Sequence, residues 1–212
     1  MFGIYFEDRY DAAQQLLPLL EKFKDDPNTI LLAIPRGALE MGNFFRDKLR
    51  IPLDIVVTKK IGAPDNEEYA VGSVAPDGSM QVDSSVISSL RIPQKYLDMK
   101  AQELKKLIDE RYKAYRGTSI LPDLKNKTVI IIDDGIATGF TTLAAVQYVK
   151  TQKPHKVILA VPVAAPDSFK KLQKEVDEII CLKTPWNFSA VGQFYKNFPQ
   201  VSDKEAKELL HF

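Results

Sequence analysis

Short, wholly apolar segments alternate along this chain with longer amphipathic ones, and that alternation restricts the fold more than any other feature. A continuous apolar run indicates a strand buried on both faces, whereas apolar residues three and four positions apart indicate a helix. The strand-like runs are 30–34, 55–57, 127–132, 156–161 and 178–182. The helix-like segments are 8–23, 38–49, 96–115 and 141–151. Buried strands that alternate with helices predict an α/β fold: a central, mainly parallel sheet flanked by helices.

The region between the second strand and the long helix has a different pattern. Residues 61–68 are polar, residues 69–75 suit a strand, and Pro76-Asp77-Gly78 is a turn signal. Residues 79–82 then suit the second arm of a hairpin. Lys59 and Lys60 follow the run 55–57, so we expect them to end that strand and to point to opposite faces.

The segment near the C-terminus is aromatic, and two interpretations of it are open. Trp186, Phe188 and Phe194 could stack on a planar base above a binding site. They could also form the core of a small C-terminal lobe, which is the more common fate of such residues. Cys181 is the only cysteine, which excludes a disulfide scaffold, and we expect it to be a buried apolar residue.

The charges of the chain balance, with 29 Lys and Arg against 28 Asp and Glu and a formal net charge of +1. No overall field favours nucleic acid or an anionic membrane, so a phosphate ligand must be held by local geometry. The longest apolar stretches, 128–132 and 157–165, are far shorter than the roughly 20 residues that span a bilayer. No secretory signal precedes them, and we expect a cytoplasmic protein. His155 and His211 are too few and too far apart for a histidine-based metal site.

The segment after the strand at 127–132 carries the strongest chemical signal. Asp133 and Asp134 follow the strand directly, and two carboxylates there can accept hydrogen bonds from vicinal hydroxyls or help to hold a hydrated Mg²⁺. Residues 137–142, Ala-Thr-Gly-Phe-Thr-Thr, supply small residues, hydroxyls and a helix N-terminus, which together suit a phosphate group. Either half alone is more simply an acidic turn or a helix cap. Joined after a buried strand, they predict a ligand with a diol and a phosphate, as in ribose 5-phosphate. No GxxxxGK[ST] or GxGxxG motif suggests another kind of nucleotide site.

Residues 129–142, VIIIDDGIATGFTT, resemble the signature of the type I phosphoribosyltransferases, which bind 5-phosphoribosyl 1-pyrophosphate (PRPP). AIPRGALEMG at 33–42 resembles their pyrophosphate loop. Segments 59–78, 115–117 and 190–203 resemble a subgroup labelled "predicted phosphoribosyltransferase", a label that names no acceptor. The resemblance implies the type I fold in a single domain, 1–212. Its core would be at about 25–165, and a small hood would be formed from about 1–24 and 176–212.

The resemblance also assigns roles to residues. Asp133 and Asp134 would hold the ribose hydroxyls directly or through Mg²⁺, and Arg36 would act with them as the third catalytic residue. Pro35-Arg36-Gly37 would bind pyrophosphate, with a cis peptide expected between Pro35 and Arg36. Arg36 as a solvated surface charge is the alternative. Either Lys59 or Lys60 would reach the diphosphate. The remaining PRPP-binding residues would be Gly135, Ala137, Thr138, Gly139, Phe140, Thr141 and Thr142.

Two residues depart from the pattern of the 6-oxopurine members. Ala137 stands where those members have an acid facing the base, so the candidate general base is absent, as it is in the adenine and orotate members. Phe140 replaces the usual Gly or Lys. Asp65, Glu67 and Glu68 are substitute bases, although a hydrated turn is the simpler interpretation of them. Arg116 is a further candidate at a closing segment, whereas the charges of 98–116, Arg111 included, fit a solvated helix face.

The sequence therefore predicts transfer of the phosphoribosyl group from PRPP to a nitrogenous acceptor, with Mg²⁺ as cofactor. A mobile segment, 61–68 or 84–96, is expected to exclude water during the reaction. A homodimer is expected from the resemblance alone. Two alternatives stay open: a PRPP-sensing regulator that binds nucleic acid or a protein, and a hydrolase of PRPP-like molecules. Nucleic-acid binding is disfavoured by the balanced charge and by the lack of a helix-turn-helix or RNA-binding signature.

Overall fold

Five short apolar strands form a parallel sheet at the centre of the computed structural model, which describes residues 3–118, 120 and 122–210, except for the side chain of Glu68. The strand order is β2-β1-β6-β7-β8, and every neighbouring pair is parallel. The strands are β1 Thr29–Ala33, β2 Leu53–Ile55, β6 Thr128–Ile132, β7 Lys156–Val163 and β8 Glu178–Lys183. The predicted α/β fold with a central parallel sheet flanked by helices is confirmed. The strand expected at 55–57 ends earlier, at Ile55.

Helices cover both faces of this sheet, which explains why its central strands β1 and β6 are buried at every position. Leu31 and Ala33 of β1 pack into one buried cluster with residues of α1 (Arg9–Leu20) and α2 (Ala38–Leu49). Ile30 and Leu32, which alternate with them, pack into a second cluster with α5 (Phe140–Thr151) and α6 (Pro166–Leu172). Successive side chains of a strand point to opposite faces, so a strand covered on both sides must be apolar at every position.

The predicted helices are present, with differences at their ends. α1 begins after Asp8, whose side chain accepts a hydrogen bond from the Asp11 amide, and passes into a short 3₁₀ turn, η1 (Glu21–Phe23). Leu19, expected on its apolar face, is 47% exposed. The long helix is α4 (Gln94–Arg116), which ends at Gly117 with a positive φ of 71°. The elements that periodicity did not predict are short: α3 Ser84–Ser89, α6 Pro166–Leu172, η2 Val191–Phe194 and α7 Asp203–Leu210.

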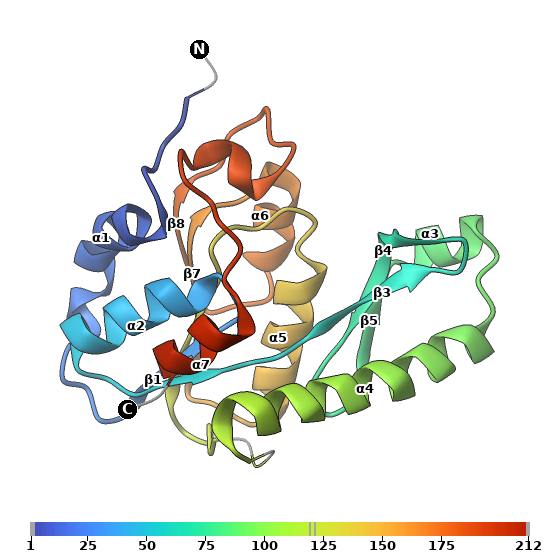
Figure 1. Cartoon of the computed structure of the whole chain (residues 1–212), viewed down its shortest axis with the longest axis horizontal. Coiled ribbons are helices and arrows are strands. Elements are labelled where there is room, and N and C mark those ends of the chain that lie inside the picture. The colour runs from blue at the N-terminus through green and yellow to red at the C-terminus, as the bar shows by residue number, and fades with distance from the viewer. Residues whose placement is uncertain (1–2, 119, 121, 211–212) are drawn as a thin grey trace.

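A second, antiparallel sheet extends from the central one together with α3 (Figure 1). Its strands are β3 Lys59–Ala63, β4 Asn66–Val74 and β5 Met80–Val82, in that order across the sheet. The predicted hairpin about residues 76–78 is confirmed as the β4–β5 pair. The expectation that Lys59 and Lys60 end a strand is wrong, because β2 stops at Ile55 and the two lysines begin β3. In Figure 1, α4 runs from this extension back toward α7.

The segments near the two ends of the chain lie side by side. The Tyr5 and Phe6 amides both donate to the Phe194 carbonyl, at 2.9 and 3.0 Å, and Phe6 pairs with Tyr195 in an isolated bridge. The rings of Tyr5 and Phe194 stack at a centroid distance of 5.4 Å. Phe194 and the partly buried Phe188 join the core, as the lobe interpretation predicts. Trp186 contradicts it, since the residue is 88% exposed. Cys181 is half-buried beside the second core cluster.

The order of the strands creates a crevice between β1 and β6. From β1 the chain goes through α2 to β2 on one side, whereas β6 and β7 follow on the other side. The carboxyl ends of β1 and β6 are adjacent, because Ala33 pairs with Ile132. Ligands of such sheets bind where the direction of strand order reverses. The segments that start at Pro35 and Asp133 therefore meet at the position that this rule gives for a ligand.

In the part of the chain that the structure describes, no helix combines the length and the apolarity required to cross a membrane.

The hydroxyl of Tyr112 on α4 holds the segment that joins the two sheets. It accepts a hydrogen bond from the Val57 amide at 2.9 Å, and the Ile55 carbonyl lies 3.5 Å away. Tyr112 is buried, so Tyr112→Phe leaves the amide without this acceptor, and we expect unfolding to cost about 1–3 kcal/mol less. Urea denaturation measures the change, with Tyr10→Phe, at a 54% exposed position, as control. Equal midpoints for the two variants would contradict the role of this bond.

Candidate active site

A cavity of about 540 Å³ lies at the crevice, and it brings together most residues of the predicted PRPP site. The predicted residues that line it are Pro35, Arg36, Gly37, Lys60, Asp133, Asp134, Gly135, Ala137, Thr138, Gly139, Thr141 and Thr142. Lys59 and Phe140 do not line it. The cavity also has walls that were not predicted, from Arg9 of α1 and from Val191, Phe198, Gln200 and Val201.

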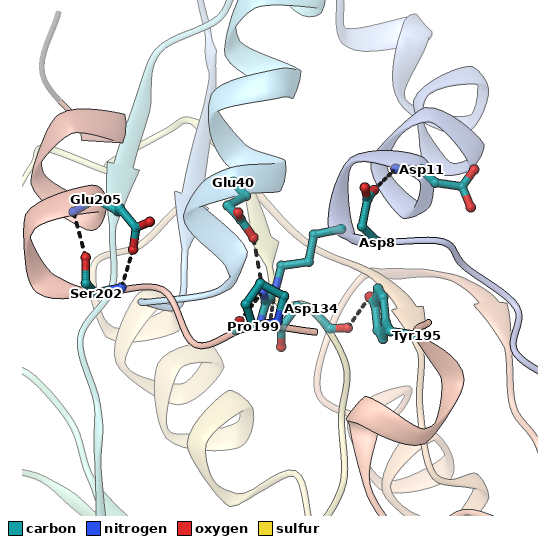
Figure 2. Close-up of polar contacts among 9 residues, drawn as sticks. Asp8, Asp11, Glu40, Asp134, Tyr195, Pro199, Ser202 and Glu205 are labelled. Carbon is teal, nitrogen blue, oxygen red and sulfur yellow. Dashed lines mark hydrogen bonds and ion pairs between the residues drawn. The ribbon is translucent and has the colours of Figure 1, made fainter. Parts of the chain in front are cut away.

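The two adjacent carboxylates have different partners. Asp133 accepts a hydrogen bond from the Asp134 amide at 2.9 Å and another from the Thr142 hydroxyl at 3.0 Å. Asp134 accepts the Nε–H of Arg9 at 2.7 Å, and its carbonyl accepts the hydroxyl of Tyr195 at 2.6 Å. Only Asp134 is therefore paired directly with a cation among the described residues. Figure 2 shows Tyr195 reaching Asp134 from the C-terminal segment.

Burial affects the protonation of both acids. Loss of hydration raises the pKa of Asp133 well above its usual range, and the adjacent Asp134 charge raises it further. Burial also raises the pKa of Asp134, although the Arg9 guanidinium opposes this effect. Two buried carboxylates in sequence carry a cost that a cation or a hydroxyl-bearing ligand can offset.

Arg9 lines the cavity but was not predicted from the sequence. Its side chain is buried, and it donates to the Glu40 carboxylate at 3.1 Å and the Pro199 carbonyl at 2.8 Å besides Asp134. The guanidinium carbon also lies 3.9 Å from the centre of the Phe198 ring. In Figure 2 Glu40, Pro199 and Asp134 gather around this group. One side chain therefore joins α1, α2, the segment after β6 and the C-terminal segment.

Gly37 is required where the pyrophosphate loop meets this ion pair. A Cβ atom at Gly37 would overlap Asp134 Oδ2 and would lie 2.7 Å from Arg9 Nε. The close approach fixes the loop 35–37 against the acidic pair. The peptide bond between Pro35 and Arg36 is cis, as the resemblance implied.

The loop that leads into α5 has the shape expected of a phosphate site. Gly139 is the residue before the helix and has φ 77°, a conformation that suits glycine. The Ser168 hydroxyl donates to the Ala137 carbonyl at 2.6 Å, and the Thr58 hydroxyl donates to the Thr141 carbonyl at 3.2 Å. These bonds hold the loop from outside the cavity and leave amide groups at the start of α5 for an anion. The Thr142 hydroxyl is already engaged with Asp133.

The two adjacent lysines point to different surroundings, as the two-residue repeat predicted. Lys60 lines the cavity. Lys59 lies beside Arg111, Arg36 and Asp203, and burial, followed by the Arg111 charge, lowers its pKa. Arg36 lines the cavity and also pairs with Asp203 of α7, at 3.4 Å.

Several secondary candidates lie elsewhere. Arg116 pairs with Asp54 at 2.9 Å and does not line the cavity. Asp65 lines a separate cavity in the extension, and Glu67 is an exposed partner of Lys100 at 3.4 Å. Neither acid lines the main cavity. Asp65 lies in the exposed turn between β3 and β4, as the hydrated-turn interpretation predicts, whereas Glu67 lies in β4. The side chain of Glu68 and residue His211 lie outside the described residues.

A signal for Arg9 does exist in the sequence. Arg9 precedes Ala12, Ala13 and Leu16 by three, four and seven positions, which puts it on the buried face of α1. On α4, Arg111 lies three positions after the buried Ile108 and four positions before the buried Tyr115. Its side chain is only partly exposed, whereas a solvated helix face was expected there. A basic residue at a core position of a helix indicates a buried acidic partner.

Comparison with known proteins agrees with this geometry. The model of the phosphoribosyl transferase domain family matches residues 12–196. The chain belongs to the phosphoribosyl transferase domain family. A Mycobacterium tuberculosis protein named "Putative phosphoribosyl transferase" is 36% identical over 208 residues, 97% of this chain and 46% of that protein. The chain therefore spans about half the length of the curated relatives that it matches over most of its sequence.

A solved structure and a shorter match extend the comparison of this phosphoribosyl transferase domain. The crystal structure of TT1426 from Thermus thermophilus superposes with a TM-score of 0.78 at 31% identity, covering 97% of both chains. A uracil phosphoribosyltransferase of Aquifex aeolicus is 32% identical over 71 residues, 34% of each chain. The first match supports the whole fold, whereas the second covers only a third of it.

Removal of the buried Asp133 charge should stabilise the metal-free domain. Asp133→Asn keeps an acceptor for the Asp134 amide and a polar group beside Thr142, while it removes the desolvated charge. We expect the melting temperature to rise by about 2–4 °C, equivalent to about 1 kcal/mol for a domain of this size. Calorimetric melting at pH 7.5 with EDTA measures this rise, with the exposed Asp98→Asn as control. A lower melting temperature would show that the Asp133 charge stabilises the fold.

Loss of Arg9 should be strongly destabilising through Asp134. Arg9→Gln leaves a buried carboxylate without its cation, and we expect it to cost about 3–5 kcal/mol. The double variant with Asp134→Asn should recover part of this loss, with a coupling of more than about 1 kcal/mol. Urea denaturation of the four proteins measures the coupling. Arg50→Gln, which breaks an exposed pair with Asp25, is the control and should change stability far less. Additive effects of the two variants would exclude a direct Arg9–Asp134 interaction.

Proposed function

We propose that this domain transfers the 5-phosphoribosyl group of PRPP to a nitrogenous acceptor, a nucleobase or related heterocycle, and releases pyrophosphate. The observation that carries the proposal is the common cavity of an acidic pair, a phosphate loop and a cationic Pro-Arg-Gly loop at one sheet edge. The acidic pair suits the diol of PRPP, the phosphate loop suits its 5-phosphate, and the Pro-Arg-Gly loop suits its diphosphate. Family membership supports the same assignment.

The proposal gives each part of the cavity a role. Asp133 and Asp134 accept hydrogen bonds from the ribose hydroxyls. The amides and hydroxyls of residues 137–142 hold the 5-phosphate at the start of α5. Arg36, with Pro35, Gly37 and a lysine of β3, binds the diphosphate as the leaving group. Lys60 is the nearer lysine, since it lines the cavity with Arg36.

The reaction exchanges one bond at the anomeric carbon of the ribose. The bond to the diphosphate oxygen breaks, and its electron pair leaves with pyrophosphate. The acceptor nitrogen supplies the pair for the new C–N bond, and its proton passes to solvent or to the released pyrophosphate. The ring carries positive charge in the transition state, so positioning and fixed charge supply the catalysis. Asp133 and Asp134 stabilise that charge, whereas Arg36 stabilises the negative charge of the leaving group.

Mg²⁺ fits this donor set when the ligand supplies most of its coordination. The described residues include no cluster of three or more side chains of the His, Cys, Asp or Glu type that suits a metal ion. Mg²⁺ commonly binds through one or two carboxylates together with substrate phosphates. Asp133 and Asp134 are therefore the residues that would hold the ion, directly or through water. When bound, it would neutralise part of the charge of the diphosphate.

The acceptor would enter beneath the segment 198–201. Phe198 and Val201 contribute apolar surface to the cavity, and Gln200 contributes an amide. Asp133 and Asp134 are the only carboxylates among the described residues that line it. A dedicated general base is therefore not part of the proposal. A nitrogen heterocycle that loses its proton readily suits this arrangement.

The wider organisation belongs to the same proposal. It comprises one domain with its core at about 25–165, a hood from about 1–24 and 176–212, closure of 61–68 or 84–96, a homodimer and a cytoplasmic location. A nucleic-acid-binding regulator is less well supported, because four basic side chains of α4 are paired with acids. The pairs are Lys100 with Glu103, Lys105 with Asp109, Arg111 with Asp203 and Arg116 with Asp54.

The deciding experiment is a calorimetric titration of PRPP with Mg²⁺. We expect micromolar binding by the wild type and at least a tenfold loss in the double variant Asp133→Asn/Asp134→Asn, since each lost charged hydrogen bond weakens binding by about tenfold. Asp98→Asn is the control for an exposed carboxylate. Pyrophosphate release is then measured across a panel of bases, and without any base.

The outcomes distinguish the candidate functions. Release that depends on one base supports transfer. Binding without release for any base favours a PRPP sensor, and release without a base favours a hydrolase. A folded wild type that does not bind PRPP would overturn the proposal and return the acidic pair to a structural role.

A further inference from the structure

Two arginines from separate segments meet at one carboxylate, and one of them, Arg36, lines the cavity. Asp203, the first residue of α7, lies 3.4 Å from Arg36 Nη1 of the pyrophosphate loop and 3.9 Å from Arg111 Nη2 of α4. The nearby charges of Arg36, Arg111 and Asp203 also affect the pKa of Lys59 on β3. The Tyr115 hydroxyl donates a short hydrogen bond to the same oxygen of Asp203.

The charges of this group do not balance. Arg36, Arg111 and Lys59 carry three positive charges around one negative charge. The pKa of Lys59 is lowered by burial and by Arg111, with Asp203 only opposing that effect. The hydrogen bond from Tyr115 and the charges of the two arginines lower the pKa of Asp203, so the carboxylate is ionised at neutral pH. A ligand with more negative charge than a carboxylate would satisfy the three cations better.

Asp203 is not needed to begin its own helix. The amide of Ser202 donates to the Glu205 carboxylate at 2.7 Å, and the Glu205 amide donates to the Ser202 hydroxyl at 3.2 Å. This reciprocal pair, drawn in Figure 2, caps α7 without Asp203. Ala206 and Leu210 are buried and hold the helix in place. The Asp203 side chain, which is 57% exposed, is thus free to turn away while α7 stays docked.

We propose that Arg111 is a further diphosphate-binding residue beside Arg36, and that the Asp203 carboxylate occupies a phosphate position until PRPP displaces it. The inference rests on the proposed function and extends the diphosphate site from Arg36 to Arg111 of α4. When PRPP displaces Asp203, the several negative charges of the diphosphate replace the single negative charge of the carboxylate. Asp203 therefore lowers the affinity for weak anions, while it leaves the cations arranged for the substrate.

The test compares three probes in the presence of Mg²⁺: PRPP, inorganic pyrophosphate and ribose 5-phosphate, which lacks the diphosphate. We expect Asp203→Asn to bind PRPP and pyrophosphate about three- to tenfold more tightly. Arg111→Gln should bind both about tenfold more weakly, because one charged contact is lost. Binding of ribose 5-phosphate should be unchanged in both variants. Calorimetry measures all three affinities.

Matched variants separate local from general effects. Glu208→Gln removes a second acid from α7, and Lys106→Gln removes an exposed cation from α4. Neither should change the ratio of pyrophosphate to ribose 5-phosphate affinity. Melting curves establish that each variant is folded, and Asp203→Asn decides the test alone if Arg111→Gln is unstable.

Two failures have different meanings. If the wild type binds PRPP but Asp203→Asn leaves pyrophosphate affinity unchanged or lowers it, this inference is wrong and the proposed function stands. The same holds if Arg111→Gln weakens ribose 5-phosphate as much as pyrophosphate, since its role is then structural. If the folded wild type binds neither PRPP nor ribose 5-phosphate, the proposed function fails and this inference fails with it.

Discussion

The buried ion pair between Arg9 and Asp134 is the interaction on which the arrangement of the site depends. It fixes the second carboxylate of the acidic pair, packs directly against Gly37, and reaches Glu40 and the Pro199 carbonyl through the same guanidinium. A buried carboxylate is tolerated only when a cation or several donors satisfy it. Because Arg9 supplies that cation from inside the protein, the acidic pair keeps a defined geometry in the absence of a ligand. Asp133 has no such cation among the described residues. A bound cation or hydroxyl group would therefore stabilise Asp133 more than Asp134.

The two sheets contribute different residues to the surroundings of Arg36. The parallel sheet brings the ends of β1 and β6 together and so creates the cavity. The antiparallel sheet begins with Lys59 and Lys60, and its first strand sends one lysine into the cavity and the other toward α4. Successive side chains of a strand point to opposite faces, so two adjacent lysines of β3 reach different surroundings. The strand β3 is therefore part of the site as well as of the extension.

Most of the fold and the centre of the site could be predicted from local sequence, because strands buried on both faces and a loop that follows them leave strong patterns. Asp133 and Asp134 were predicted in this way, and Gly37 was predicted through the family resemblance. Arg9 and Phe198 were missed, since their roles arise from contacts between segments more than 180 residues apart, as for Arg9 and Pro199. Lys59 and Lys60 were assigned to the wrong strand because β2 stops at Ile55, two residues before its apolar run ends. Trp186 was expected in a core and is exposed, as composition alone does not tell which aromatic residue of a cluster faces solvent.

The side-by-side packing of residues 4–8 with 194–197 has a consequence for biosynthesis. Arg9 and the central strands are synthesised first, and Tyr195, Phe198 and Pro199 are synthesised only after β8. A nascent chain can therefore assemble the parallel sheet while Arg9 still lacks its last partners and the cavity lacks one wall. The cavity would therefore be completed only when residues 195–199 pack against Arg9 and the segment after β6.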